Sequence, residues 1–320
     1  MRYFLGCDVA KAKIDVSFID SNGQELWASK VPNTGVDVAV LLLAIIGNYP
    51  DDGLECVVES TSTYHFTLAE TSYTLGLDCR VYNPILTKQG IKGTVRGKKT
   101  DRTDATMIAR LGLRGEGRFY TPEPYKSVKY HARSCQKLSN LSTSFKRHND
   151  HITNLLEDGL SQDAKTLMTG IQEAIVAARR QLREDLAVSA QGSVFTRLQT
   201  IPGVGPYVAA SIIGEIQDMK RFKTAHALTA YAGLDPKIRQ SGHSLNSTGR
   251  LTKRGSSYLR RSIFIAASVA RQYDSNMKAL YDKKRNEGKS YTVATIIVAR
   301  KLLSIVRAMW LSEQDYDPNL

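Results

Sequence analysis

The chain has 320 residues, of which 42% are hydrophobic and 23% charged, so its composition is that of a folded protein and excludes wholesale disorder. At roughly 150 residues per domain, this length predicts about two domains. The 44 basic residues exceed the 31 acidic ones and give a net charge of +13. Such an excess favours a polyanionic partner, either nucleic acid or an anionic membrane surface.

The positive charge is concentrated in two stretches. Residues 1–79 contain only four basic residues and are acidic overall, whereas residues 80–118 contain ten basic and three acidic residues. Residues 237–307 contain sixteen basic and three acidic residues. A solvated surface could explain one such stretch, but two of them favour a polyanion.

Membrane-spanning and secreted classes of protein are disfavoured. No run of about 18 apolar residues occurs, and Asp8 and Lys11 come too early for the core of a signal peptide. The four cysteines are far apart and include no CxxC pair. A reduced cytosolic protein without a structural zinc site fits best.

The N-terminal part predicts an α/β domain. Short apolar runs at residues 2–7, 14–19, 56–59 and 79–82 are typical of strands. Residues 34–48 and 65–75 have helical patterns between them. Strands that alternate with helices indicate this fold class.

Residues 125–188 predict two long helices with a break at Asp158-Gly159. They could form an antiparallel or intermolecular coiled coil that serves as an interaction arm, and a plain core bundle is about equally common for such a pattern. From Thr196 onward the chain is again helical, with helices expected at 258–272 and 290–311. Before these two helices, the polar and basic residues 237–257 read as a long loop, which is usually functional or disordered.

Four carboxylates stand out by position. Asp8 and Glu59 follow or end apolar strands, and Asp101 and Asp104 open an apolar helix on neighbouring positions of one face. Such a cluster would repel itself unless a divalent metal neutralised it, and Mg²⁺ takes oxygen ligands. Each acid alone has an ordinary explanation: Asp101 could favour the helix dipole, and Asp104 could pair with a nearby cation. The set of four beside a basic stretch favours a site that clamps a phosphodiester with two metals.

These segments resemble a known family. GCDVAKAKIDV, VVESTSTY, YNP and KKTDRTDA are similar to motifs of the DEDD-type insertion-sequence transposases and the Piv-like DNA invertases. The resemblance implies an α/β RuvC-like, RNase H-type N-terminal domain whose acidic motif falls on Asp8, Glu59, Asp101 and Asp104. The implied cofactor is Mg²⁺, with two ions bound by these residues. One departure is visible, because Ser62 stands where the family's turn usually has glycine.

The C-terminal half carries two further motifs. Residues 198–216, LQTIPGVGPYVAASIIGEI, resemble a helix-hairpin-helix, in which Gly203 and Gly205 would let the backbone approach a phosphate. Such a hairpin can also simply pack helices. YAGLDPKIRQSG and the following basic segment match the family's C-terminal transposase domain, where the serine of the Ser-Gly pair is the proposed nucleophile. It maps onto Ser241; the chemistry alone would not separate it from Ser244 or Ser247, and a loop serine is more often a turn former.

The resemblance covers nearly the whole chain and divides it into three parts. Residues 1–124 would form the metal-binding catalytic domain, residues 125–195 the helical coiled-coil arm, and residues 196–320 the α-helical transposase domain. The residues expected to meet nucleic-acid phosphates are Lys92, Arg96, Lys98, Lys99, Gly203, Gly205, Arg239, Arg250, Lys253, Arg254, Arg260 and Arg261.

The resemblance therefore implies a DNA recombinase, which is either a transposase or a site-specific invertase. It would lie in the cytoplasm of a bacterium or archaeon, associated with the nucleoid. A homodimer or homotetramer joined by the arm is implied, since the two parts of the site can come from different protomers. Some relatives are guided by a structured bridge RNA, and the basic stretches suit RNA as well as DNA. The main alternative is a metal-dependent junction resolvase or related nuclease that uses water. A non-enzymatic nucleic-acid-binding protein and, remotely, an actin-like sugar kinase remain as other classes.

Overall fold

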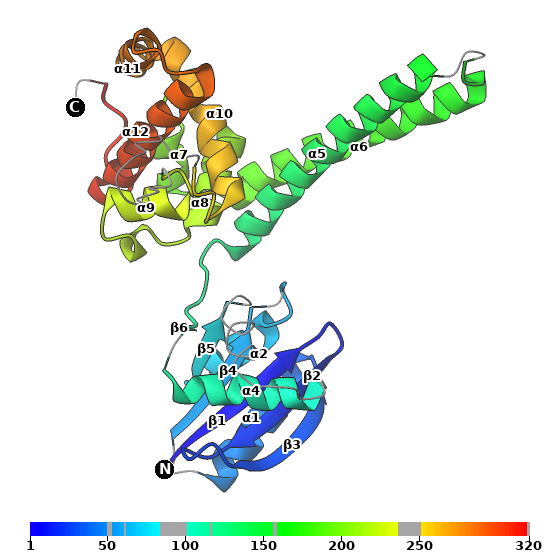
Figure 1. Cartoon of the computed structure of the whole chain (residues 1–320), viewed down its shortest axis with the longest axis vertical. Helices are drawn as coiled ribbons and strands as arrows, with labels where there is room; N and C mark the ends of the chain where they lie inside the picture. Colours follow the sequence, from blue (N-terminus) through cyan, green and yellow to red (C-terminus); the bar gives the residue numbers. More distant parts are fainter. Residues whose placement is uncertain are drawn as a thin grey trace, which may run out of the picture. The chain divides into compact units, whose positions relative to one another are not determined.

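The computed structural model describes residues 1–49, 53–60, 62–83, 101–115, 117–155, 159–235 and 251–318, with the backbone alone at Asp101 and Arg102. These residues form two compact units, Met1–Pro122 and Glu123–Leu320 (Figure 1). Each unit has its own hydrophobic core and is described by itself.

The N-terminal unit is built on a mixed six-stranded sheet. Its strands are β1 (Arg2–Val9), β2 (Lys13–Ile19), β3 (Glu25–Pro32), β4 (Gly53–Glu59), β5 (Asp78–Tyr82) and β6 (Arg118–Phe119). Their order in the sheet is β3-β2-β1-β4-β5-β6. Neighbours pair antiparallel except at the centre, where β1, β4 and β5 are parallel. This mixed α/β sheet fits the RuvC-like domain expected from the sequence.

Side-chain alternation along the strands separates the two faces of the sheet. On one face, Leu5 and Cys7 of β1 pack with residues of α1 (Gly35–Asn48) and α2 (Phe66–Thr74). On the other face, Phe4 of β1 and Val57 of β4 pack against α4 (Asp101–Leu113). The helix that opens with the Asp101–Asp104 pair therefore covers the face to which the even-numbered side chains of β1 point.

The C-terminal unit is helical. It contains α5 (Lys126–Leu155), α6 (Gln162–Ser189), α7 (Ser193–Leu198), α8 (Pro206–Ile216), the 3₁₀ helix η1 (Met219–Arg221), α9 (Ala225–Tyr231), α10 (Ser257–Tyr273), α11 (Ser275–Asn286) and α12 (Tyr291–Ser312). None of the described helices is long and apolar enough to cross a membrane.

Helices α5 and α6 lie side by side and project from the rest of this unit as an arm (Figure 1). Gln172 of α6 donates a 2.8 Å hydrogen bond to Ser142 of α5. At the base of the arm, Gly214 of α8 lies so close to α5 that a Cβ there would stand 2.7 Å from Lys129 Cα. The arm is therefore anchored by direct backbone packing on α8.

A buried ion pair reinforces this base. Arg133 of α5 donates to both oxygens of Glu215, at 2.6 and 3.0 Å, and Glu215 is almost fully buried. Burial by itself would lower the pKa of Arg133, but the hydrogen bonding to Glu215 raises it above the ordinary value. Glu215 also accepts a 2.7 Å bond from Ser256, the N-cap of α10. The start of α10 is thus tied to the base of the arm.

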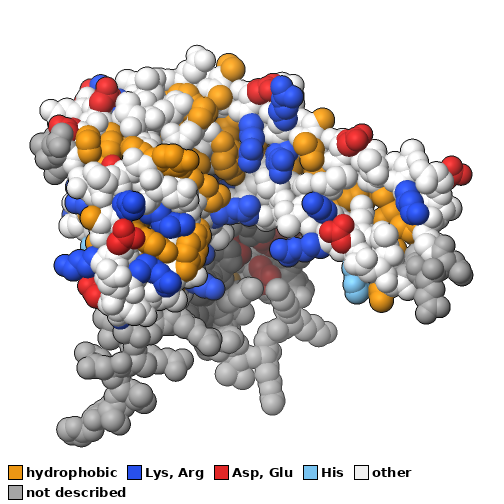
Figure 2. Space-filling model, turned by 90° about the horizontal axis from the view of Figure 1, so that it is seen from above, with side chains coloured by type: hydrophobic (Ala, Val, Ile, Leu, Met, Phe, Trp, Pro, Cys, Tyr) orange, Lys and Arg blue, Asp and Glu red, His pale blue; other side chains and the backbone are white. Residues whose placement is uncertain are grey.

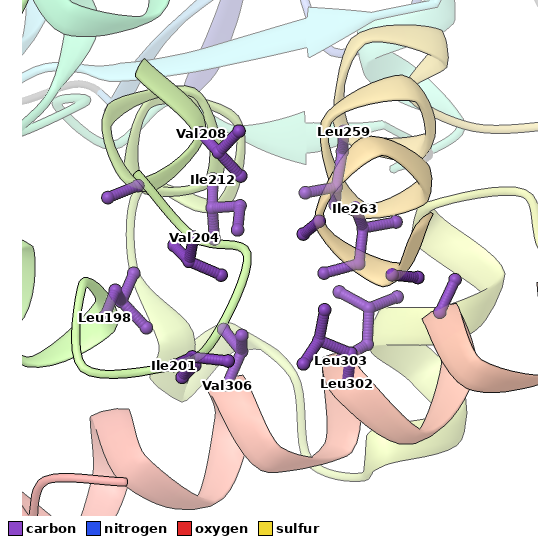
Figure 3. Close-up of a cluster of buried hydrophobic side chains, with 14 of the residues drawn as sticks. Leu198, Ile201, Val204, Val208, Ile212, Leu259, Ile263, Leu302, Leu303 and Val306 are labelled. Carbon is purple, nitrogen blue, oxygen red and sulfur yellow. The ribbon is translucent and has the colours of Figure 1, made fainter. Parts of the chain in front are cut away.

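The core of the C-terminal unit gathers apolar side chains from α8, α10 and α12 around the turn that precedes α8 (Figure 3). Ile201 and Val204 of this turn are both 2% exposed and lie with Val306 and Ile212 in the close-up. Burial of this kind is worth about 1.5–3 kcal/mol per large side chain. The turn is therefore part of the folded core.

All four cysteines are described, buried and free of disulfide bonds. Burial, followed by the neighbouring thiols, raises the pKa of Cys7 and Cys79, and burial raises that of Cys56 to about 12. Cys7, Cys56 and Cys79 are core side chains of the sheet, and Cys135 of α5 belongs to the core of the C-terminal unit.

Candidate active site

Asp8 and Glu59 lie at the same level on adjacent parallel strands. The last paired residues of β1 and β4 are Cys7 and Val58, and Asp8 and Glu59 each come one residue later. Asp8 shares a face with Gly6, and Glu59 shares a face with Val57, which is the face covered by α4. Both carboxylates are partly buried.

Gly6 sets the position of α4 on this face. A Cβ at residue 6 would overlap the carbonyl oxygen of Ala105 and the amide nitrogen of Ala109, so the helix backbone lies directly on β1. Further back along the strand, Phe4 contacts Gly112 at the other end of α4. Because residue numbers fall along α4 in the direction in which they rise along β1, α4 runs antiparallel to β1. Its first turn, with Asp101 and Asp104, therefore lies toward the Asp8 end of the strand.

The four predicted ligands are thus brought to one end of the sheet by three elements. Carboxylate oxygens are the donor type that Mg²⁺ prefers, so their chemistry fits a divalent metal. Among the described side chains no three acidic, histidine or cysteine groups lie close enough together to hold a metal ion. The carboxylate of Asp101 lies outside the described atoms. Asp8 and Glu59 each make a further interaction.

The turn after Glu59 has a backbone conformation at residue 62 that suits the family's usual glycine. Ser62 has a φ of 51°, in the left-handed region that glycine adopts without steric cost. The backbone therefore keeps a conformation suited to glycine, although the side chain is serine. Ser62, three residues after the end of β4, is held in this conformation at a cost of about 1 kcal/mol.

Ser241 lies outside the described residues, as do Lys92, Arg96, Lys98, Lys99, Arg239 and Arg250. The described chain on both sides of residues 236–250 is fixed. The amide of Thr252 donates a 2.9 Å hydrogen bond to the carbonyl oxygen of Asp235, and Ser256 donates to that of Tyr231. The two ends of the segment that carries Ser241 are therefore held side by side.

Two partly buried arginines bind the backbone just before residues 236–250. Arg260 donates a 3.0 Å bond to the carbonyl oxygen of Ala232, and Arg300 donates a 2.9 Å bond to that of Leu234. Burial lowers the pKa of both guanidinium groups. Their hydrogen bonds stabilise the chain just before the segment. Sequence reasoning missed Arg300, whose only signal was its place in the C-terminal basic stretch.

The other described cations of this region are more accessible. Lys253 and Arg254 are exposed, and Lys253 has a φ of 53°. Arg261 is also exposed and donates to the Asn140 side chain of the arm. Lys and Arg side chains lie among apolar ones over this unit (Figure 2). Because these three side chains are exposed, they are accessible to a polyanion.

The two glycines of the turn before α8 differ in their surroundings. Gly203 has a φ of 88°, and a Cβ there would stand 2.9 Å from the amide nitrogen of Ala270 in α10. Helix packing alone therefore accounts for glycine at residue 203. Gly205 is the N-cap of α8, and a Cβ there would meet nothing within 4 Å. The open backbone at Gly205 is the better candidate for approach to a phosphate.

Gly6 is a residue of the site that sequence reasoning did not select. Its only signal was a glycine within an apolar strand, which can mark close backbone approach. The contact to Ala105 and Ala109 shows that it determines where Asp104 lies relative to Asp8.

Two family models match this chain. A family model described as Transposase, of the DEDD type found in IS110, matches residues 5–160. A second, described as Transposase IS116/IS110/IS902 family, matches residues 195–282. The two matches contain the acidic residues and the Ser241 segment, respectively.

Two similar proteins align with all or nearly all of this chain, and a third aligns with part of it. The pilin gene-inverting protein of Moraxella bovis is 24% identical over 100% of this chain and 99% of its own length. The transposase for insertion sequence element IS1111A of Coxiella burnetii is 23% identical over 98% of this chain and 90% of its own. An uncharacterized protein of insertion element IS110 from Streptomyces coelicolor is 31% identical over 44% of this chain and 34% of its own.

Among solved structures, Thermus thermophilus RuvC is 11% identical, with a TM-score of 0.29, over 37% of this chain and 99% of its own. A likeness of that size adds nothing to the assignment. The family and whole-chain matches define an enzyme of DNA recombination. The chain belongs to the DEDD-type transposase and DNA-invertase family that includes IS110.

Proposed function

We propose that this recombinase cleaves and rejoins DNA through the acids Asp8, Glu59, Asp101 and Asp104 together with the hydroxyl of Ser241. The observation that carries the proposal is the antiparallel placement of α4 on β1, which directs its acidic first turn toward Asp8 and Glu59. The acidic residues and the serine belong to different units of the chain, and in the proposed assembly they come from different protomers.

The four carboxylates would hold two Mg²⁺ ions, which would supply charge neutralisation for cleavage of a phosphodiester. The protein's own contribution is to fix the ligands on two strand ends and one helix. The close packing at Gly6 keeps that helix from moving away.

Ser241 acts as the nucleophile. Its Oγ forms a bond to phosphorus while the bond from phosphorus to a deoxyribose oxygen breaks, and that oxygen leaves as a hydroxyl after it takes up a proton. A hydroxyl of a second DNA end then attacks the phosphoserine link and frees the serine. Bond energy is conserved in the covalent intermediate, so strand exchange proceeds without ATP.

Basic residues bind the DNA at both parts of the site. Lys92, Arg96, Lys98 and Lys99 precede α4 in the sequence, and Arg239, Arg250, Lys253, Arg254 and Arg261 lie near Ser241 in the sequence. They offset the charge of the phosphates and of the pentavalent species formed during attack. Gly205 and, less directly, Gly203 contribute backbone at the start of α8.

The arm, residues 125–195, joins protomers into a dimer or tetramer. The support is that several of its apolar side chains face solvent, as can be followed along the arm in Figure 2. They are Leu141, Leu155, Leu167, Ile171, Val176 and Val188. Exposed apolar side chains repeated along a helix pair favour association with another copy. A structured guide RNA is a further partner, bound by the same basic residues. The protein acts in the cytoplasm, in association with the nucleoid.

The experiment compares wild type with Ser241→Ala, Ser244→Ala and Asp104→Asn on a DNA substrate that carries the ends of the enzyme's own element. Wild type and Ser244→Ala should form a denaturant-stable protein–DNA adduct, and Ser241→Ala and Asp104→Asn should form none. Cleavage that persists in Ser241→Ala without an adduct in wild type would instead identify a nuclease that uses water.

A further inference from the structure

A fifth carboxylate lies beside the acidic site. Asp15 of β2 is the direct cross-strand partner of Asp8 in β1, so the two side chains point to the same face. On the other side of β2, Lys30 of β3 is the cross-strand partner of Asp15. Lys13 precedes Asp15 by two residues and shares this face.

Both lysines bind the Asp15 carboxylate through different oxygens. Lys13 Nζ lies 3.0 Å from Oδ2, and Lys30 Nζ lies 3.0 Å from Oδ1. The Asp15 side chain is 5% exposed, whereas those of Lys13 and Lys30 are 43% and 64% exposed. A buried carboxylate therefore holds two accessible ammonium groups in a cluster with a net charge of +1.

A second ion-pair group on the same face shows a different arrangement. At the opposite end of β1, the buried Glu55 binds Arg2 at 2.6 Å and Arg80 at 2.5 Å. Arg80 is itself buried and also donates to the carbonyl oxygen of Gly115, so it is committed to the protein interior. In the Asp15 cluster both cations keep access to solvent, since the side chains of Lys13 and Lys30 are 43% and 64% exposed.

Basic residues are scarce in the part of the chain that contains this cluster. Residues 1–79 contain only four basic residues, and two of them are Lys13 and Lys30. They stand next to a site rich in carboxylates, which by itself repels a phosphate backbone. Two ammonium groups held at the edge of that site oppose the repulsion where a DNA strand must enter.

We propose that Lys13 and Lys30 form a binding site for DNA backbone phosphate beside the acidic site, and that Asp15 is the positioning residue that aims them. The inference rests on the proposed function for the location of the DNA strand. Each lysine provides one phosphate contact, and a compact ammonium suits such a point contact.

The test uses the full chain, a fluorescein-labelled 30-base-pair DNA duplex, and EDTA to prevent cleavage. Affinity is measured at several salt concentrations for wild type, Lys30→Gln, Lys13→Gln and Arg2→Gln. Arg2→Gln is the matched control, because it removes one exposed cation from the same face and leaves its buried acid with one partner.

Lys30→Gln and Lys13→Gln should each weaken binding about three- to tenfold and lower the slope of log affinity against log salt by about one. Arg2→Gln should leave both quantities near wild type. Equal effects of Lys30→Gln and Arg2→Gln would overturn the inference, because general attraction by net charge would then explain the data.

Asp15→Asn gives an independent outcome. It raises the net charge by one, so general attraction predicts tighter binding, whereas loss of lysine positioning predicts equal or weaker binding. If Asp15→Asn fails to fold, the lysine variants still decide. Because no cleavage is measured, failure of the metal and serine chemistry would appear separately, as a wild-type enzyme that binds DNA and forms no adduct.

Discussion

Gly6→Ala is the substitution that most directly perturbs the geometry of the acidic site. An added Cβ would stand 2.6 Å from the Cβ of Ala109 and would overlap backbone atoms of Ala105 and Ala109. An ordinary contact needs 3.4–4 Å, so α4 must move away from β1 by about 1 Å. Overpacking of this kind costs about 1–3 kcal/mol, and a 1 Å misplacement of catalytic groups can cost about 100-fold in rate.

The assay compares Gly6→Ala with Gly112→Ala, at the other end of the same helix. The three atoms nearest to a Cβ at residue 112 are side-chain atoms of Phe4 and Val57, and Gly112 lies at the end of α4 opposite its acidic first turn. Both variants should lower the free energy of unfolding. At a temperature where both are folded, only Gly6→Ala should reduce metal-dependent adduct formation about 100-fold. Wild-type stability and wild-type activity in Gly6→Ala would refute the packing of α4 on β1.

Three further predictions concern stability and reactivity. Ser62→Gly should raise the free energy of unfolding by up to about 1 kcal/mol in denaturant titrations, because glycine adopts the left-handed backbone of residue 62 without strain; a loss of stability would contradict this. The buried thiols, with the pKa of Cys56 raised to about 12, should resist Ellman's reagent at pH 8 while the chain is folded, and all four should react in denaturant. Burial, and then the hydrogen bond to Asp274, raises the pKa of Tyr316 above its ordinary value of 10.0. Its contribution to stability is therefore complete below pH 10.0 and is lost progressively as the pH rises from there toward the raised pKa. Thermal unfolding between pH 9 and 11 should therefore show a smaller loss for Tyr316→Phe than for wild type, and equal losses would exclude this contribution.

The sequence predicted most of the N-terminal elements, because buried strands and amphipathic helices have clear periodic patterns. It missed β3 (Glu25–Pro32), where partly exposed side chains do not alternate cleanly. Strand and helix positions also led to Asp8, Glu59 and the α4 acids. The role of Gly6 could not be predicted, since it depends on which helix crosses the strand. The cluster around Asp15 depends on cross-strand register, which residue spacing within one strand does not reveal.

The C-terminal unit shows the same limit in another form. The turn before α8 was predicted from the resemblance of residues 198–216 to a helix-hairpin-helix, yet the different surroundings of Gly203 and Gly205 depend on the tertiary position of α10. Likewise, a basic stretch in the sequence does not distinguish exposed cations such as Arg254 from those, such as Arg260 and Arg300, that bind the backbone of their own unit.

The identity of the covalently attached residue tests the central claim most directly. Trypsin cleaves after Arg239 and Arg250, so residues 240–250 form one peptide that contains Ser241, Ser244 and Ser247. After the reaction is stopped with denaturant and the DNA is digested, tandem mass spectrometry should find a nucleotide joined through phosphate to Ser241 of this peptide. An adduct on another residue, or a wild-type enzyme that rejoins DNA and never carries one, would contradict the serine mechanism.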